Sequence, residues 1–402
     1  MSLIKKYLDR ARPHFQPGGR FQALHSVFDG VDTFLYTPRD TSRSGVHIHD
    51  ALDSKRVMII VVVALLPCLL FGMYNCGYQN YLGSGHADFP FWELMAYGFL
   101  AILPKIVVTY LVGLGIEFVV AQWRHEEIQE GFLVTGILIP LICPIETLWM
   151  MALATAFSVI FVKEVFGGTG YNIFNVALVT RAFLFFSYPA SMSGDRAFIS
   201  ARPICGLGGT VNFADGISGA TPLGQVATHA GGPLEIHNIV GDPVSNWDAF
   251  LGLIPGSFGE TSTLCIFIGA ALLLLTGIAS WKVMLSVFAG GLLAGVAVHV
   301  LQNSDYPASM LTPWQQIIYG GFAFAAVFMA TDPVTAARTG AGKYIYGLLV
   351  GVIAVIIRTY NNGYPEGAML AVLLMNAFAP LIDWCVVQTN INRRLNRVKA
   401  KP

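Results

Sequence analysis

One threonine stands in a setting that favours its modification. The sequence DGISGATPLG, residues 215–224, lies in the longest polar interval of a chain that is otherwise mostly apolar. Thr221 is preceded by small residues and followed by Pro222, which fixes φ and stiffens the turn. The small residues are Ser218, Gly219 and Ala220. We therefore expect an exposed turn on which another enzyme can reach the Thr221 hydroxyl.

Three carboxylates in or beside apolar segments are candidates for an ion path, because a charge there must be paired, hydrated or functional. Asp332, in TDPVTA, is either a functional carboxylate or the N-cap of the helix that follows, and the residues favour neither interpretation. Asp383, in APLIDWCVV, and Glu130, before an apolar run, could form an inward entrance for Na⁺, which takes hard oxygen ligands. Each could instead be a solvated helix terminus, which is the favoured interpretation for Glu130.

Two further segments could hold a ligand. Gly168, Asn172 and Asn175 belong to KEVFGGTGYNIFN, where glycines expose backbone amides and asparagines can bind the edge of a heterocycle. A tight turn between two spans would require the same glycines. Arg181, inside ALVTRAFLFF, is an anchor at the membrane interface or a clamp for a ligand.

Composition indicates which elements position these residues. Of 402 residues, 54% are hydrophobic and 12% are charged, whereas a soluble domain carries roughly a quarter charged residues. This composition is typical of an integral membrane protein. Lys plus Arg and Asp plus Glu both total 24, which gives no electrostatic reason to expect a nucleic-acid partner. The 6 cysteines are scattered without a CxxC pair, which argues against a zinc or iron–sulfur site.

An all-α polytopic membrane fold follows, with about ten transmembrane helices of roughly 20 residues each in the lipid bilayer. The expected spans begin near Val57, Phe91, Phe132, Leu148, Tyr171, Ser262, Trp281, Pro313, Tyr344 and Gly367. They define a basic N-terminal segment (1–56), a first membrane repeat (57–187), a polar loop (188–261), a second repeat (262–388) and a basic tail (389–402).

Charge distribution orients the spans, since Lys and Arg collect on cytoplasmic segments. Both basic ends are expected in the cytoplasm, and the loop 188–261, which is poor in Lys and Arg, in the periplasm. Arg124 and Lys163 also fall beside expected cytoplasmic connections. Lys105, directly after Pro104, is the exception, and it indicates a long, tilted or kinked second span.

The sequence also resembles two related halves, although two apolar helices could share such features without a repeat. GFLVTGILIPLICPIET, from Gly131, and GFAFAAVFMATDPVTAA, from Gly321, are both apolar runs broken at proline. An odd number of spans in each half makes the second half inverted relative to the first. Two inverted repeats of about five helices, with interrupted helices, are typical of transporters that bind a ligand or ion at the breaks.

The motifs described above resemble those of a known family. Asp215, Ser218, Gly219, Ala220 and Thr221 match the D-x-x-S-G-A-T signature at which membrane redox subunits receive FMN through its phosphate. The chain as a whole is similar to the family that contains the B subunits of the Na⁺-translocating NADH:quinone reductases. GGTGYNIFN, RAFLFFSYP and TDPVTA carry this wider similarity.

This resemblance implies a component of a bacterial inner-membrane complex that passes electrons from NADH to ubiquinone and exports Na⁺. Thr221 would carry covalent FMN, attached by a flavin transferase that uses FAD. A noncovalent riboflavin would lie among the helices toward the inner side, and ubiquinone would bind near the cytoplasmic face. The NADH and iron–sulfur chemistry would belong to the five other subunits.

Two alternatives remain open. The D subunit of the Rnf ferredoxin:NAD⁺ oxidoreductases shares the fold and the flavin threonine, but the long N-terminal extension and HEEIQEGF favour the quinone-linked family. The inverted halves alone would also suit a Na⁺-coupled secondary transporter. A covalent flavin would exclude the transporter, because a solute carrier does not use one.

Overall fold

The structure is a computed structural model. It describes residues 3–15, 19, 21, 28, 44–46, 54–86, 88, 90–124, 131–145, 147–192, 197–213, 218–229, 231–302, 305–361 and 363–399. Within these ranges the chain is helical, with isolated bridges at Ile204 and His237 in place of extended strands. The predicted all-α membrane fold is confirmed. Glu130 and Asp215 lie outside the described residues.

The first half of the helical bundle follows the short separate helix α1 (Leu3–Phe15). It contains α3 (Ser54–Gly83), α4 (Phe91–Arg124), α5 (Phe132–Ile142), α6 (Leu148–Ser158), the π-helix η2 (Val159–Glu164) that continues α6, and α7 (Val176–Ser187). The break after α5 has a local cause. Pro144 disfavours the helical conformation at the residue before it, and Cys143 accordingly adopts φ −95° and ψ 148°.

The second half has a more irregular backbone. It contains α11 (Thr263–Leu275), α12 (Trp281–Val300), α15 (Gly340–Tyr360) and α16 (Ala368–Lys399). After the short helix η4 (Pro307–Met310), three short pieces replace the predicted span from Pro313: α13 (Gln315–Ile318), α14 (Phe322–Phe324) and the π-helix η5 (Ala325–Met329). The helix stops before the Asp332–Pro333 pair, as the sequence predicted.

Five helices are long and apolar enough to cross a membrane: α3, α4, α12, α15 and α16. The chain is therefore a multi-pass membrane protein. The expected length of roughly 20 residues is wrong for α5, α7 and α11, which have 11, 12 and 13 residues. Two causes are visible in the sequence. Proline ends α5 early, and the Asn175 side chain caps α7 after the predicted start at Tyr171.

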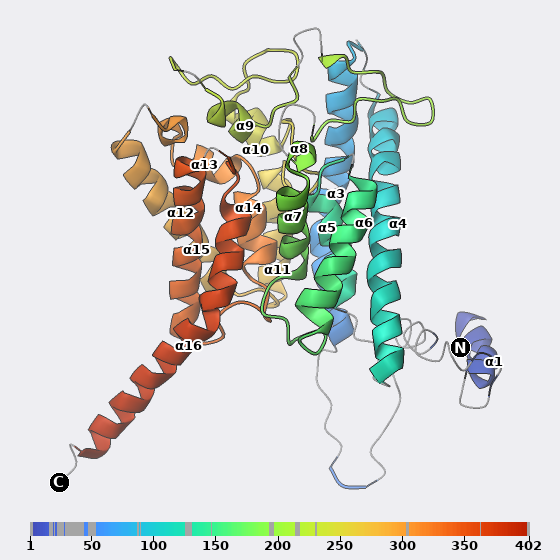
Figure 1. The fold of residues 1–402 in the computed structure, drawn as a ribbon, viewed down its shortest axis with the longest axis vertical. Helices are drawn as coiled ribbons and strands as arrows, with labels where there is room; N and C mark the ends of the chain where they lie inside the picture. The colour runs from blue at the N-terminus through green and yellow to red at the C-terminus, as the bar shows by residue number, and fades with distance from the viewer. Residues whose placement is uncertain are drawn as a thin grey trace.

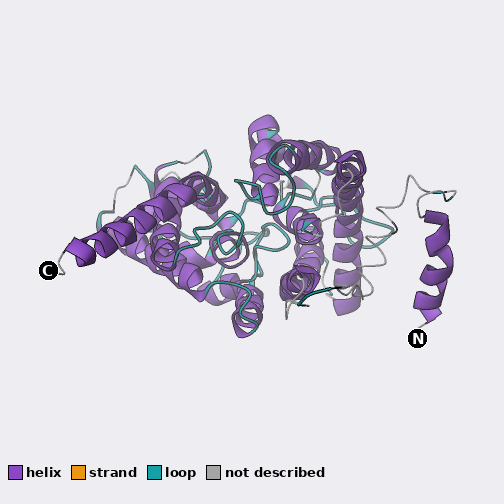
Figure 2. Ribbon diagram, turned by 90° about the horizontal axis from the view of Figure 1, so that it is seen from below, coloured by secondary structure: helices purple, strands orange, loops and turns teal. Residues whose placement is uncertain are grey.

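The two halves lie side by side, with α3–α7 in one group and α11–α16 in the other (Figures 1 and 2). Helices α3 and α11 pack together, as do α7 and α16, so these two pairs join the halves. Helices α12 and α15 approach closely because glycines line their contact. A Cβ added at Gly351 would lie 2.2 Å from the carbonyl oxygen of Val287, and such close approach is how membrane helices associate.

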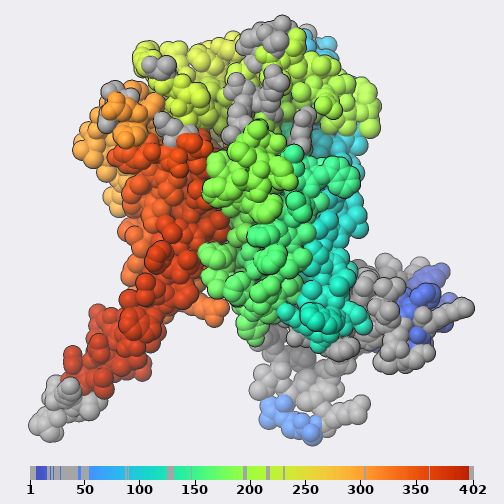
Figure 3. Space-filling view, viewed as in Figure 1, coloured from blue at the N-terminus to red at the C-terminus, as the bar shows by residue number. Residues whose placement is uncertain are grey.

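The start of α3 and the end of α16 lie at one end of the bundle, drawn as the lower end in Figure 1. The loop 188–261 contains α8 (Pro189–Met192), α9 (Pro222–Ala227) and α10 (Asn246–Leu251). Its described residues cover the opposite, upper end (Figure 3). The loop and the end of α16 therefore lie at opposite ends of the bundle, which agrees with the topology predicted from Lys and Arg.

Candidate functional site

A cavity of about 310 Å³ opens beneath the loop at the upper end of the bundle. We call it the upper pocket. Its polar lining comes from three parts of the chain: Thr221 and Thr228 from the loop, Arg181 from α7, and Glu366 from the turn before α16. Phe185 and Tyr364 supply aromatic walls, with ring centroids 4.4 Å apart. The pocket is thus part aromatic, part charged, and open to a threonine hydroxyl.

Thr221 is held at the first turn of α9. Its Oγ1 accepts a hydrogen bond of 3.1 Å from the backbone N–H of Gly224, and Pro222 occupies the first helical position. Both features are typical of helix N-termini. The Gln225 side chain donates to the carbonyl of Ala220 and fixes the preceding turn. The expected fully exposed turn is therefore absent: Thr221 is half-buried and faces the pocket.

The neighbours of Thr221 are small, as predicted, but less accessible than expected. Gly219 and Ala220 are buried, and Ser218 is half-buried with its hydroxyl accepting a 3.3 Å hydrogen bond from the backbone N–H of Ala220. The cause is tertiary: the loop folds down onto the helical bundle. The sequence showed only the small size of these residues.

Arg181 forms the floor of the upper pocket and is 2% exposed. Its Nη1 donates to Glu260 at 3.1 Å and to the carbonyl of Ile142, and its Nη2 pairs with Glu366. Its Nε has no hydrogen-bond partner among the described residues. The prediction for Arg181 left open an interface anchor or a ligand clamp. The structure places it in the protein interior, paired with two carboxylates and lining a pocket.

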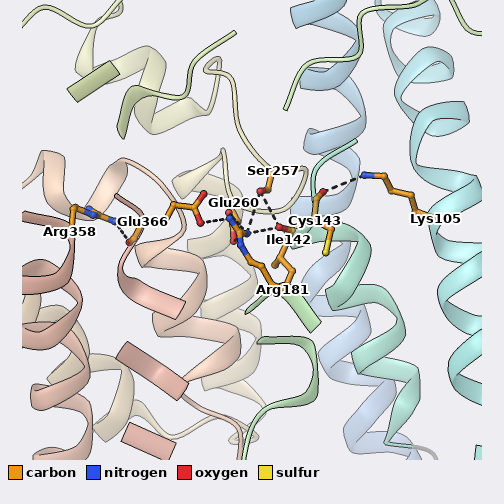
Figure 4. Close-up of polar contacts among 8 residues, drawn as sticks. All are labelled: Lys105, Ile142, Cys143, Arg181, Ser257, Glu260, Arg358 and Glu366. Atoms are coloured by element: carbon orange, nitrogen blue, oxygen red, sulfur yellow. Dashed lines mark hydrogen bonds and ion pairs between the residues drawn. The ribbon is translucent and has the colours of Figure 1, made fainter. Parts of the chain in front are cut away.

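A row of charges extends from this floor across both halves, at one level of the bundle (Figure 4). Arg358 of α15 donates to the backbone carbonyl of Gln316 in the single turn of α13, and at 3.2 Å to that of Glu366. On the other side of Arg181, Lys105 of α4 reaches the carbonyls of Cys143 and Pro144. Buried cations therefore satisfy the carbonyl groups that the broken helices leave open, which hydrocarbon could not do.

A second cavity, of about 140 Å³, lies toward the other end of the bundle. We call it the lower pocket. Asn172, Asn175, Thr169 and Asp332 line it, with Lys163 at its border. The hydroxyl of Thr169 has no partner among the described residues. The structure thus brings together the Gly-Asn tract and the second break, which the sequence predicted as separate sites.

Some side chains of the lower pocket already form hydrogen bonds to backbone groups. The Oδ1 of Asn175 accepts from Ala177 and Leu178 at the start of α7, and its Nδ2 donates to Asp332 at 3.3 Å. Asn172 donates to the carbonyl of Phe174 through its Nδ2, which leaves its side-chain oxygen out of this bond.

Two other predicted residues have mainly structural contacts. Asp332 accepts from the backbone N–H of Val334 at 3.0 Å and from the Thr335 hydroxyl at 3.1 Å, so it caps the turn after the break while facing the pocket. Gly168 adopts φ 91°, a left-handed conformation that glycine tolerates, and is buried beside the pocket rather than lining it.

Asp383 lies apart from both pockets. Its carboxylate accepts from the backbone N–H groups of Arg338 and Thr339, at 2.7 and 3.0 Å, and from the Thr339 hydroxyl. It therefore ties α16 to the start of α15. The structure does not bring Asp383 into contact with Asp332.

A buried ion pair between Glu117 of α4 and Lys163 of η2 was missed at the sequence level. Lys163 was predicted beside a cytoplasmic connection, and it does lie at the end of η2, next to the connection to α7. The sequence did not indicate its burial, because a positive charge ends an apolar run whether or not a partner buries it; both residues are 5% exposed. The available signal was Glu117 inside GLGIEFVV, a carboxylate within an apolar segment.

Comparison with known proteins adds the family. A model of the NQR2, RnfD, RnfE family matches residues 41–392. A Pseudomonas paraeruginosa protein, named as the B subunit of a Na(+)-translocating NADH-quinone reductase, is 42% identical, over 98% of this chain and 99% of the relative. Proteins of the same name from Chromohalobacter salexigens and Klebsiella pneumoniae are each 41% identical, over 99% and 98% of this chain and 97% and 99% of the relatives.

Proposed function

The chain belongs to the NQR2, RnfD, RnfE family, and from this premise we propose that it is the B subunit of a Na⁺-translocating NADH:quinone reductase. The near full-length similarity to proteins of that name supports this choice over the Rnf alternative. Within that complex it works with five other subunits, passes electrons toward ubiquinone and takes part in Na⁺ export. A flavin, where bound, supplies the electron-transfer chemistry.

We place covalent FMN on Thr221. The observation that carries this assignment is the opening of the Thr221 hydroxyl into a pocket with aromatic walls and a cationic floor. A phosphoester at Oγ1 leaves that oxygen able to accept from the Gly224 N–H, so attachment need not unfold α9. The Nε of Arg181, which has no partner among the described residues, is a donor suited to the polar edge of a flavin ring. The flavin transferase would act on this loop before the pocket closes around the product.

We place the noncovalent riboflavin in the lower pocket. Asn172 offers a side-chain oxygen and Thr169 a hydroxyl without a partner among the described residues, which suit the imide edge and the ribityl hydroxyls of a flavin. Asp332 and Asn175 complete a polar side opposite apolar residues of α3 and α11. Asp332 is also our candidate for the Na⁺ path, with Asp383 and Glu130 as candidates closer to the cytoplasm.

The orientation that goes with these assignments puts the upper pocket at the periplasmic side of the bacterial inner membrane and both termini in the cytoplasm. Fusing a phosphatase that is active only in the periplasm tests it. Fusion in the exposed turn at Gly232 should give activity, and fusion at Lys399 should not. Activity in the opposite pattern would reverse the orientation.

Thr221→Ala tests the function directly. It should remove the flavin fluorescence that stays with this chain on a denaturing gel, and abolish quinone reduction, while the complex still assembles. Mass spectrometry of the wild-type peptide spanning residues 215–224 should show FMN added with loss of water.

Thr228→Ala is the matched control, because Thr228 lines the same pocket and bonds the backbone carbonyl of Gly224. It should keep the fluorescence. An unmodified Thr221 peptide from active enzyme would refute the covalent assignment.

A further inference from the structure

The C-terminal end of α5, here called its carbonyl end, leaves backbone carbonyl groups without helical hydrogen-bond partners. The carbonyl groups of Cys143 and Pro144 follow the last turn of α5, and no helix continues to supply N–H donors. The next helix begins only at Leu148. Carbonyl groups at such a break must find partners, because the surrounding hydrocarbon provides none.

Lys105 supplies the partner. Its ammonium donates to the carbonyl of Cys143 at 3.3 Å and to that of Pro144, and lies 5.4 Å from the centre of the Phe258 ring. The side chain is 1% exposed. Among the described residues, no carboxylate forms an ion pair with it. A buried cation held by carbonyl oxygens and a ring face, without a counter-charge, is an unusual arrangement for a merely structural lysine.

The oxygen ligands are those of a cation site. In transporters with interrupted helices, the carbonyl groups of unwound segments and of half-helix C-terminal ends coordinate monovalent cations. The C-terminal end of α5 also presents the negative end of its helix dipole to this point. The Thr147 hydroxyl donates to the Pro144 carbonyl at 3.0 Å and helps to hold that oxygen in place.

We propose that the carbonyl end of α5 is a binding site for a small monovalent cation, and that this chain fills it with its own Lys105 ammonium. The tethered ammonium keeps a transported cation from lodging at the break. Hydrogen-bond capping alone would need only an N–H donor at this position. A cation site also needs the positive charge, so the experiment must separate the charge from the hydrogen bonds.

Lys105→Ala removes the cation and opens space for a free one. The intact complex, purified from membranes, is heated in sodium chloride, ethylammonium chloride or choline chloride at equal ionic strength. The variant should melt well below wild type in choline, and ethylammonium should recover most of the loss. Sodium should recover part of it. The gain from ethylammonium should be absent in wild type and in Thr109→Val, which alters buried packing of α4 against α6 without touching these carbonyls.

Lys105→Gln separates charge from hydrogen bonding, because the amide keeps two N–H donors without a charge. It should remain destabilised in choline. A melting temperature equal to wild type, or no response of Lys105→Ala to ethylammonium, would overturn the proposal. If Lys105→Ala does not accumulate, Lys105→Met replaces it, because Met keeps the apolar part of the lysine side chain. Its melting temperature in sodium chloride is then compared with that in choline chloride. None of these outcomes depends on flavin attachment at Thr221, which is read separately from fluorescence on the gel.

Discussion

The upper and lower pockets use the same scaffold differently. Each lies where short helices end, and each receives residues from both halves of the bundle. The upper pocket rests on Arg181, which is shared by two carboxylates, and it gains a threonine hydroxyl from the loop. The lower pocket is lined by amides, hydroxyls and one carboxylate, and its buried cation Lys163 pairs with Glu117.

This difference in lining shows which part of the chain makes the upper pocket unlike the lower one. The second break lines the lower pocket, whereas the upper pocket touches the first break only through its floor residue Arg181, which bonds the Ile142 carbonyl at the end of α5. Among the described residues, the loop 188–261 has no equivalent between other spans, and it adds Thr221 to the upper pocket alone. We therefore propose the upper pocket for the attached cofactor and the lower pocket for an exchangeable one.

The largest expected effect concerns Arg181. Arg181→Met leaves Glu260 and Glu366 without their guanidinium partner, and breaking a buried pair costs about 3–5 kcal/mol. The melting temperature and yield of the assembled complex should fall sharply. Lys163→Met, which strands only Glu117, should have a smaller effect, and adding Glu117→Gln should recover part of its loss. Equal losses for the two single variants would contradict the charge comparison.

An intermediate effect is expected in the lower pocket. Asn172→Ala removes the side-chain oxygen proposed to bind the flavin and should reduce the noncovalent flavin extracted from the complex several-fold, while the covalent fluorescence of this chain is unchanged. Thr180→Val is the control, because Thr180 is buried on α7 and bonds the carbonyl of Val176. Full riboflavin content in Asn172→Ala would remove this residue from the site.

The smallest effect is expected at Asp383, where Asp383→Asn weakens a backbone cap worth about 1 kcal/mol. Asp332→Asn, inside the lower pocket, should raise the Na⁺ concentration for half-maximal quinone reduction more than Asp383→Asn does. Steady-state rates over a range of NaCl at constant ionic strength measure both. An unchanged Na⁺ dependence in both variants would reduce the two carboxylates to helix caps.

The sequence identified many residues of the candidate site, but it did not indicate which of them lie next to one another. The Gly-Asn tract and TDPVTA were separate predictions, and their meeting at Asn175 and Asp332 depends on how α7 packs beside the second break. Glu117 and Lys163 are 46 positions apart, and no local pattern indicates that they pair.

The sequence by itself determined the membrane class, most helix starts near apolar boundaries, the breaks at proline and the small residues around Thr221. These follow from hydropathy, from proline stereochemistry and from side-chain size, all of which act over a few residues. Only the tertiary structure decided that Thr221 faces a pocket, and that Arg181, Arg358 and Lys105 satisfy the open carbonyl groups of the breaks. Those contacts join segments far apart in the chain, and a buried charge finds its partner only when the helices have packed.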